Sequence, residues 1–320
     1  MLKADQNTFI KISLVMLSLL SLAFFLVLFS SVRCEPDDMI IGLECRDGSF
    51  YQTLMNRYYT HTFRPAYTLF AYLTIGFTND TSMYNVTIFM FYFLLYVFFV
   101  WIIYKLLIEI FSLKNMDRKD KLLLACFSVL QVTCIYFLTT ERIEIFGWLS
   151  ASIIHLLPVV FIFFSAWLIM KQDHRKTDYL FLFISAVIIA GSAEHLAASA
   201  TACVIAILLF NRIRTKEFVK KENKLFLTKT LFFVILLSVF LMLFISNPGV
   251  KVRLAISQSF IAEDPVQYSL RFTETCRVFF KPYKLFSLLF MLCGWGLFKR
   301  VFREESNKIF SSTCFIFSLG

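Results

Sequence analysis

Charged residues are scarce in this 320-residue chain, and the short motifs of several large enzyme classes are missing. Asp, Glu, Lys and Arg make up 17% of the residues, whereas soluble domains carry about 25%. The chain has no Cys-x-x-Cys pair and no histidine-rich metal spacing, which argues against common zinc and redox sites. It also lacks a Walker A loop, a glycine-rich dinucleotide loop and a Gly-x-Ser-x-Gly elbow, which argues against P-loop NTPases, Rossmann enzymes and α/β-hydrolases.

Long apolar runs take the place of those motifs. Hydrophobic residues account for 58% of the chain, and 40 of them are Phe. Several uninterrupted runs reach the roughly 20 residues that a helix needs to cross a bilayer. We therefore expect an all-α, polytopic transmembrane helical bundle that forms one transmembrane domain over residues 1–320, with no soluble domain.

The basic residues predict which side of the membrane each loop occupies. The net charge of +10 would suit nucleic acid if it were spread over one surface, but it is concentrated in short loops between the apolar runs. Such clusters mark cytoplasmic loops and attract anionic lipids, so we expect membrane lipids as partners, no nucleic acid, and a cytoplasmic N-terminus. The clusters are Lys114–Lys121, Lys171–Lys176, Arg212–Lys224 and Lys299–Arg303.

This topology predicts about eight spans. The first run is too long for a signal-peptide core and is expected to stay as an anchor. The apolar segment Phe63–Phe77 is short and is expected to form an interfacial or re-entrant helix. A final run, Ile309–Leu319, resembles the start of a truncated ninth span, so we expect the chain to be incomplete at its C-terminus. The expected spans are Ile10–Val32, Tyr84–Ile108, Leu122–Thr139, Trp148–Met170, Tyr179–Ala190, Leu196–Phe210, Leu225–Ser246 and Leu285–Phe298.

The fifth and sixth spans are unusually short and meet at Glu194-His195. The preceding Gly191-Ser192-Ala193 offers a break in the helix. Because both flanks of this hairpin are basic, its turn is expected below the outer surface, inside the protein or in a water-filled cavity. Burying ionisable side chains at such a depth costs free energy, and residues of this kind usually have a function. The alternative is that the pair lies among lipid headgroups.

The outside loops 33–83 and 247–284 are the candidate site region. Asp37 and Asp38 follow the first span within a few residues, and Pro36 disfavours helix at the residue before it. Adjacent carboxylates there are suited to act as a general base or to hold a divalent metal, and the alternative is a solvated helix end. Cys34 and Cys45 flank the acidic pair, and a disulfide between them is an option in an oxidising compartment.

Two groups of cations accompany the acidic pair. Arg57, His61 and Arg64 recur at i, i+4 and i+7, so on one helix they would share a face and suit a phosphate. Lys251 and Arg253 follow a Pro-Gly turn after the seventh span, where they are available to an anionic group. The alternatives are headgroup anchoring for the first group and a plain exit turn for the second.

Four of these motifs, in this order, resemble the GT-C superfamily of integral-membrane glycosyltransferases, and most closely its bacterial, uncharacterised, glucosyltransferase-like multi-spanning members. Asp37-Asp38 stands where those proteins carry an acidic pair, and Asn56-Arg57 stands where they tend to have Gly-Arg. Gly191–Glu194 matches their small-residue turn loosely. Pro248-Gly249 with Arg253 matches their Pro-Gly motif followed by a basic residue.

The resemblance implies an inverting transferase that moves a sugar from a polyprenyl-phosphate-linked donor to a cell-envelope glycan or lipid acceptor. It implies a bacterial cytoplasmic membrane, with the site facing the periplasm. Asp37 or Asp38 would be the catalytic base, and Arg57, His61, Arg64, Glu194, His195, Lys251 and Arg253 would bind substrate. No cofactor is required, although Asp37 and Asp38 leave room for a divalent metal. The alternatives are a transporter or flippase, or a polymerase of lipid-linked glycans.

Overall fold

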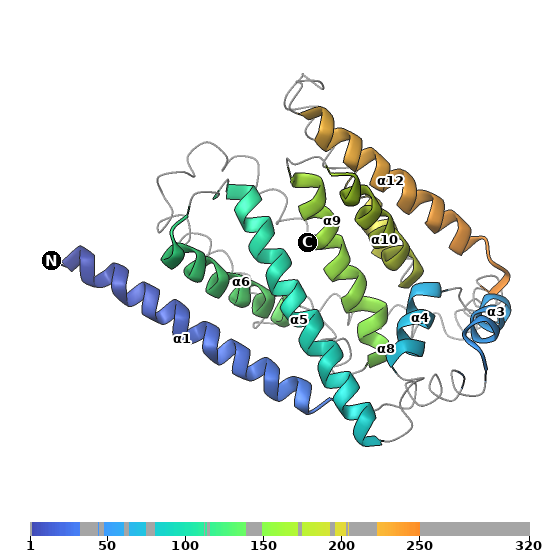
Figure 1. Cartoon of the computed structure of the whole chain (residues 1–320), viewed down its shortest axis with the longest axis horizontal. Coiled ribbons are helices and arrows are strands. Elements are labelled where there is room, and N and C mark those ends of the chain that lie inside the picture. The colour runs from blue at the N-terminus through green and yellow to red at the C-terminus, as the bar shows by residue number, and fades with distance from the viewer. Residues whose placement is uncertain are drawn as a thin grey trace, which may run out of the picture. The chain divides into compact units, whose positions relative to one another are not determined.

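A computed structural model of the chain describes ten helical elements and short segments beside them (Figure 1). The described residues are 2–32, 44, 48–60, 64–74, 81–111, 113, 116–138, 149–171, 175–192, 196–202, 204 and 223–249. Every regular element within these ranges is helical, and they contain no strand. The elements are α1 (Leu2–Ser30), α3 (Phe50–Thr60), α4 (Pro65–Thr74), α5 (Thr81–Phe111), α6 (Arg118–Leu138), α8 (Leu149–Ala151), the π-helical turn η1 (Ser152–Leu156), α9 (Leu157–Met170), α10 (Lys176–Ser192) and α12 (Asn223–Ile245).

Five of the described helices are long and apolar enough to cross a membrane, which agrees with the expected all-α membrane protein. These helices match the first, second, third, fourth and seventh expected spans. The fifth expected span corresponds to α10, which has 17 residues. The sixth is described as helix only over residues 196–202 and 204, and Leu285–Phe298 and Ile309–Leu319 lie outside the described residues. The five stretches are Lys11–Ser30, Met83–Ile110, Arg118–Phe137, Leu149–Met170 and Leu225–Leu243.

The helices gather into two compact units. The first unit contains residues 1–31, 92–142 and 270–320, and the second contains residues 32–91 and 143–269. Helix α5 contributes to both, since residues up to Phe91 belong to the second unit and residues from Tyr92 onward belong to the first.

In the first unit, α1 packs against α6 through small hydroxyl residues. Ser18 Oγ donates to the backbone carbonyl of Cys126 at 2.9 Å, and the hydroxyls of Ser21 and Thr133 are hydrogen-bonded to each other. Small residues let membrane helices approach closely, and their hydroxyls then bond across the interface. Cys134 is buried on α6.

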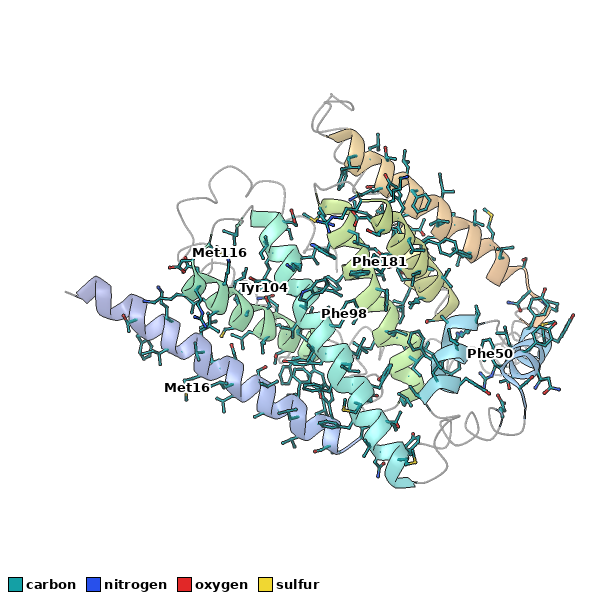
Figure 2. The ribbon with its side chains drawn as sticks, in the orientation of Figure 1. Met16, Phe50, Phe98, Tyr104, Met116 and Phe181 are labelled. Carbon is teal, nitrogen blue, oxygen red and sulfur yellow. The ribbon has the colours of Figure 1, made fainter. Side chains whose placement is uncertain are left out.

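Aromatic rings join α1 to α5 one and two turns further along α1. The ring centroids of Phe25 and Tyr96 lie 4.5 Å apart, and those of Phe29 and Tyr92 lie 5.4 Å apart. Ser18, Phe25 and Phe29 recur at helical spacing and are all buried. The opposite face of α1 exposes apolar residues such as Met16 (Figure 2), as expected of a surface that contacts lipid.

In the second unit, α10 lies between α9 and α12 and also contacts α4 (Figure 1). Lys229, Phe233 and Leu237 recur every four residues on the buried side of α12. Leu231, Ile235, Val239 and Met242 form an exposed apolar stripe on another side of the same helix. An apolar outer stripe with polar groups on the inner side is the arrangement expected of a helix that faces lipid.

The end of α10 approaches the first turn of α4 so closely that a side chain at Gly191 would be tightly packed. A Cβ atom added to Gly191 would lie 3.1 Å from both Cβ and the backbone nitrogen of Ala66 and 3.2 Å from Cγ of Pro65. All three atoms belong to the first turn of α4 and none is the end of a flexible side chain, so the contact cannot be relieved by a simple side-chain rotation. Gly191 therefore sets the distance between α10 and α4.

We expect Gly191→Val to destabilise the protein by about 1–3 kcal/mol, because the added methyl groups overpack this contact. Thermal unfolding of the detergent-solubilised chain measures the loss. Gly48→Val is the matched control, since a Cβ atom there would meet Thr53 Oγ1 at 3.4 Å and the Glu44 carbonyl at 3.5 Å, which are ordinary contacts. Equal losses for the two variants would contradict the role given to Gly191.

Candidate functional site

Two of the site residues expected from the sequence are described by the structure. These are Arg57 and Arg64, which both belong to the second unit. The other expected site residues, and the two cysteines beside the acidic pair, lie outside the described residues. They are Cys34, Asp37, Asp38, Cys45, His61, Glu194, His195, Lys251 and Arg253.

Arg57 is held on the inner side of α3 by an acid and an aromatic ring. Its Nε and Nη2 atoms donate to Glu44 Oε2 at 3.0 and 2.6 Å. Its guanidinium carbon lies 5.4 Å from the ring centroid of Tyr67 on α4. The carboxylate and the ring both stabilise the cation and fix its direction. Glu44 was not among the residues expected in the site.

The expected arrangement of Arg57 and Arg64 on one helical face does not occur. Helix α3 ends at Thr60, and α4 begins at Pro65, so the two arginines belong to different elements. The physical reason is Pro65, whose ring disfavours helix at the preceding residue. Arg64 instead occupies the N-cap position of α4, where its carbonyl accepts the backbone N–H of Thr68 at 2.9 Å.

The small-residue motif at the end of α10 also differs from expectation. Gly191 and Ser192 were expected in a break after Ala190, but both are helical and buried. The contacts of Gly191 with Pro65 and Ala66 explain this, since they stabilise the last turn of α10. The description of α10 ends at Ser192 and helix is described again from Leu196, and residues 193–195, where the turn at Glu194-His195 is expected, lie outside the described residues.

The end of α12 shows a similar shift. Helix α12 ends at Ile245, the turn falls at Ser246-Asn247, and Pro248 and Gly249 are already helical. The turn that was expected at Pro248-Gly249 therefore lies two residues earlier in the chain. Proline fits the first position of a helix because the amide hydrogen that it lacks would have no partner there.

The π-helical turn η1 interrupts the fourth span and contains His155. The backbone N–H of Leu157 donates to Ser152 O, which is the wide hydrogen-bond spacing of a π-helix. Pro158 explains the distortion, because it offers no amide hydrogen to the carbonyl of Ile154, and its ring would clash with that group in an α-helix. Sequence reasoning missed this turn, although a histidine and a proline three residues apart in an apolar span are its signal.

The start of α4, the turn η1 and the end of α10 meet in the second unit. We call this place the α4–η1–α10 junction and define it by residues 64–68, 152–156 and 191–192. It joins two motifs that the sequence places far apart, Arg64-Pro65 and Gly191-Ser192, and adds His155. The hydroxyl of Ser192 is fully buried there and has no hydrogen-bond partner in the described ranges.

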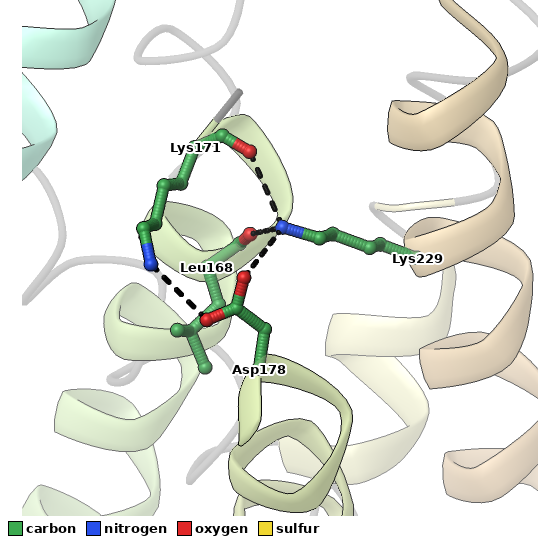
Figure 3. A network of polar contacts seen from close by, with 4 residues as sticks. All are labelled: Leu168, Lys171, Asp178 and Lys229. Atoms are coloured by element: carbon green, nitrogen blue, oxygen red, sulfur yellow. Dashed lines mark hydrogen bonds and ion pairs between the residues drawn. The ribbon is translucent and has the colours of Figure 1, made fainter. Parts of the chain in front are cut away.

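The other end of α9 and α10 carries a buried ion network that includes α12 (Figure 3). Lys229 Nζ donates to Asp178 Oδ2 at 2.9 Å, to Leu168 O at 3.0 Å and to Lys171 O at 3.2 Å. Lys171 Nζ donates to Asp178 Oδ1 at 3.2 Å. All three N–H donors of the Lys229 ammonium are thus satisfied, although its side chain is 0% exposed. Sequence reasoning missed this network too, and its signal was a lysine within an apolar span.

The helix dipoles favour this arrangement. Lys229 binds carbonyls at the C-terminal end of α9, where the dipole attracts a cation, and Asp178 lies in the first turn of α10, where it attracts an anion. Burial alone would raise the pKa of Asp178, but hydrogen bonds from Lys229 and Lys171 outweigh it and hold that pKa below its usual value. The resulting stabilisation is present above pH 3.8 and is lost as the pH falls through the lowered pKa.

The described residues contain no group of three or more His, Cys, Asp or Glu side chains that would hold a metal. The expected metal option rests on Asp37 and Asp38, so it stays a prediction. Comparison with protein-family models, with curated proteins and with solved structures gives no match for this chain. The resemblance to GT-C transferases is therefore supported by the sequence motifs alone.

We expect Asp178→Ala to destabilise the second unit by about 3–5 kcal/mol, because it leaves the Lys229 ammonium buried without its counter-ion. Thermal unfolding in detergent measures the change. Lys119→Met, which removes an exposed cation from α6, should have an effect close to zero. Unfolding of Asp178→Ala at the wild-type temperature would show that the network is not a stabilising contact.

Proposed function

We propose that this integral membrane protein is a glycosyltransferase of the GT-C type. In this proposal, it moves a sugar from a polyprenyl-phosphate-linked donor to a cell-envelope glycan or lipid acceptor. The chain would have about eight spans and a cytoplasmic N-terminus in a bacterial cytoplasmic membrane, with its site at the periplasmic face. The motifs in the outside loops are the first support for it.

The α4–η1–α10 junction is the observation that carries the proposal. Helices α9 and α10 have the Lys171–Lys176 loop at one end, and basic loops are retained in the cytoplasm. The junction lies at their other end, which is then the outer end. Its three elements carry Arg64, His155 and Ser192 toward the side where the resemblance expects the substrate site.

The residues suit displacement of a sugar from a phosphate. Asp37 or Asp38 would take the proton from the acceptor hydroxyl as its oxygen attacks the anomeric carbon. The bond between that carbon and the phosphate oxygen would break, and the phosphate would leave with the electron pair. Arginines such as Arg57 and Arg64 would stabilise its growing negative charge. A single displacement of this kind inverts the anomeric configuration.

A transporter or flippase of lipid-linked glycans is the second candidate function. The short, broken hairpin that the sequence predicts around Glu194 favours it, because broken membrane helices often carry transport sites. The two functions differ in their products. A flippase moves the lipid-linked substrate between leaflets, whereas a transferase forms a new glycosidic bond.

We expect Asp37→Asn or Asp38→Asn to reduce sugar transfer by about 10²–10⁴-fold, because the neutral amide cannot accept the hydroxyl proton. Each is tested separately in the full chain, reconstituted in lipid with a radiolabelled polyprenyl-phosphate sugar. Asp117→Asn is the matched control, since Asp117 is an exposed carboxylate on the loop before α6. If Asp37→Asn and Asp38→Asn both transferred sugar at the wild-type rate, the acidic pair would have no part in the mechanism.

The same vesicles distinguish the two functions. Transfer of label to an acceptor by the wild-type chain supports the transferase. Movement of labelled lipid between leaflets with no new glycosidic bond supports the flippase and overturns the transferase.

A further inference from the structure

Helix α3 crosses the direction of the long helices of its unit. Figure 1 shows α3 nearly end-on, whereas α9, α10 and α12 run along the plane of the view. Its 11 residues span about 16 Å, which is too short to cross a bilayer. It packs on α4, and α4 in turn contacts η1 and the end of α10 near Gly191. Both short helices therefore lie at the end of the unit away from the Lys171–Lys176 loop.

One side of α3 is occupied by its contacts within the protein. The ring centroids of Phe50 and Tyr72 on α4 lie 5.8 Å apart, and the Arg57 guanidinium lies over the ring of Tyr67. Thr53 is buried between these positions. Phe50, Thr53 and Arg57 recur at i, i+3 and i+7, so they share one face of the helix. Arg57 is thus turned toward the protein, and the outer sides of α3 carry other residues.

A second side of α3 exposes an aromatic stripe, which we define as Tyr51, Met55, Tyr58 and Tyr59. Tyr51 and Tyr59 are 67% and 58% exposed. They recur with Met55 at every fourth residue, so the three side chains share a face. Tyr58 extends the stripe, with its ring edge-on to that of Tyr59 at 5.0 Å between centroids. Tyrosine combines an apolar ring with a polar hydroxyl and is enriched where membranes meet water.

A third side of α3 is polar, and its neighbour α4 is apolar on the outside. Gln52 and Asn56 are exposed at i and i+4, and they form a polar stripe beside the tyrosines. On α4, Leu69 and Leu73 are exposed at the same spacing, as expected of a surface that contacts acyl chains. A helix with one apolar and one polar outer side lies in the plane of the membrane interface, with the apolar side toward the acyl chains.

We propose that the aromatic stripe of α3 binds the phospholipid headgroup layer of the outer leaflet. The rings of Tyr51 and Tyr59 pack on the first carbons of the acyl chains, and their hydroxyls donate to phosphate and ester oxygens of the headgroups. Gln52 and Asn56 face water. The anchor of this helix is therefore aromatic, in contrast to the arginine anchor that was the alternative for Arg57. The proposal does not depend on the transferase.

The test introduces one tryptophan at a time into α3 of the full chain, reconstituted in phosphatidylcholine vesicles. Tyr51→Trp and Tyr59→Trp probe the aromatic stripe, and Gln52→Trp on the polar stripe is the matched control. All three positions are exposed, so each variant should unfold at the wild-type temperature. The emission of the wild-type chain, which has 4 Trp, is subtracted. The added emission is quenched with lipid brominated near the headgroup and, separately, with iodide on both sides of the membrane.

We expect the brominated lipid to quench Tyr51→Trp and Tyr59→Trp more strongly than Gln52→Trp, and iodide to quench them in the reverse order. Strong quenching of all three variants by iodide, with no effect of the brominated lipid, would place α3 in water and overturn the proposal. Protection of Tyr51→Trp and Tyr59→Trp from both quenchers would also overturn it, because a second copy of the chain or another protein would then cover the stripe.

Discussion

The ammonium group of Lys229 is the contact on which the second unit depends most. It binds two carbonyls at the end of α9 and the carboxylate of Asp178 at the start of α10, so a single buried group joins three helices. A charge in such apolar surroundings is tolerated only when its hydrogen bonds are complete. The position of α12 relative to α9 and α10 is therefore fixed by electrostatics as well as by packing.

The far end of α10 is fixed in a different way. There Gly191 has no side chain, and the first turn of α4 occupies much of the space that a Cβ atom would need. Helix α10 is thus held at its start by the ion pairs of Asp178 and at its end by the close contact of Gly191 with α4. Ser192 follows Gly191 directly, and the π-turn η1, which interrupts the α-helical hydrogen bonding of the fourth span, contacts both α4 and α10.

The sequence predicts the helices of this protein well because hydrophobic length is a local property. The ends of α9 and α12 were expected within one residue of their observed positions, since Lys171 and Ser246 close their apolar runs. Local chemistry also explains the errors. Pro65 separates Arg57 from Arg64, and Gly191 remains helical because α4 packs against it. Neither the sequence around Gly191 nor the sequence of α4 shows that these two segments are in contact.

Apolar runs, basic loops and prolines determine by themselves that this chain forms helices long and apolar enough to cross a membrane, and where most of the described ones begin and end. They do so because the cost of burying a backbone or a charge in lipid depends on a few neighbouring residues. Only the tertiary structure decided which polar residues meet. Lys229 with Asp178, Arg57 with Glu44, and Gly191 with the first turn of α4 are contacts between separate segments, and no local pattern in the sequence predicts them.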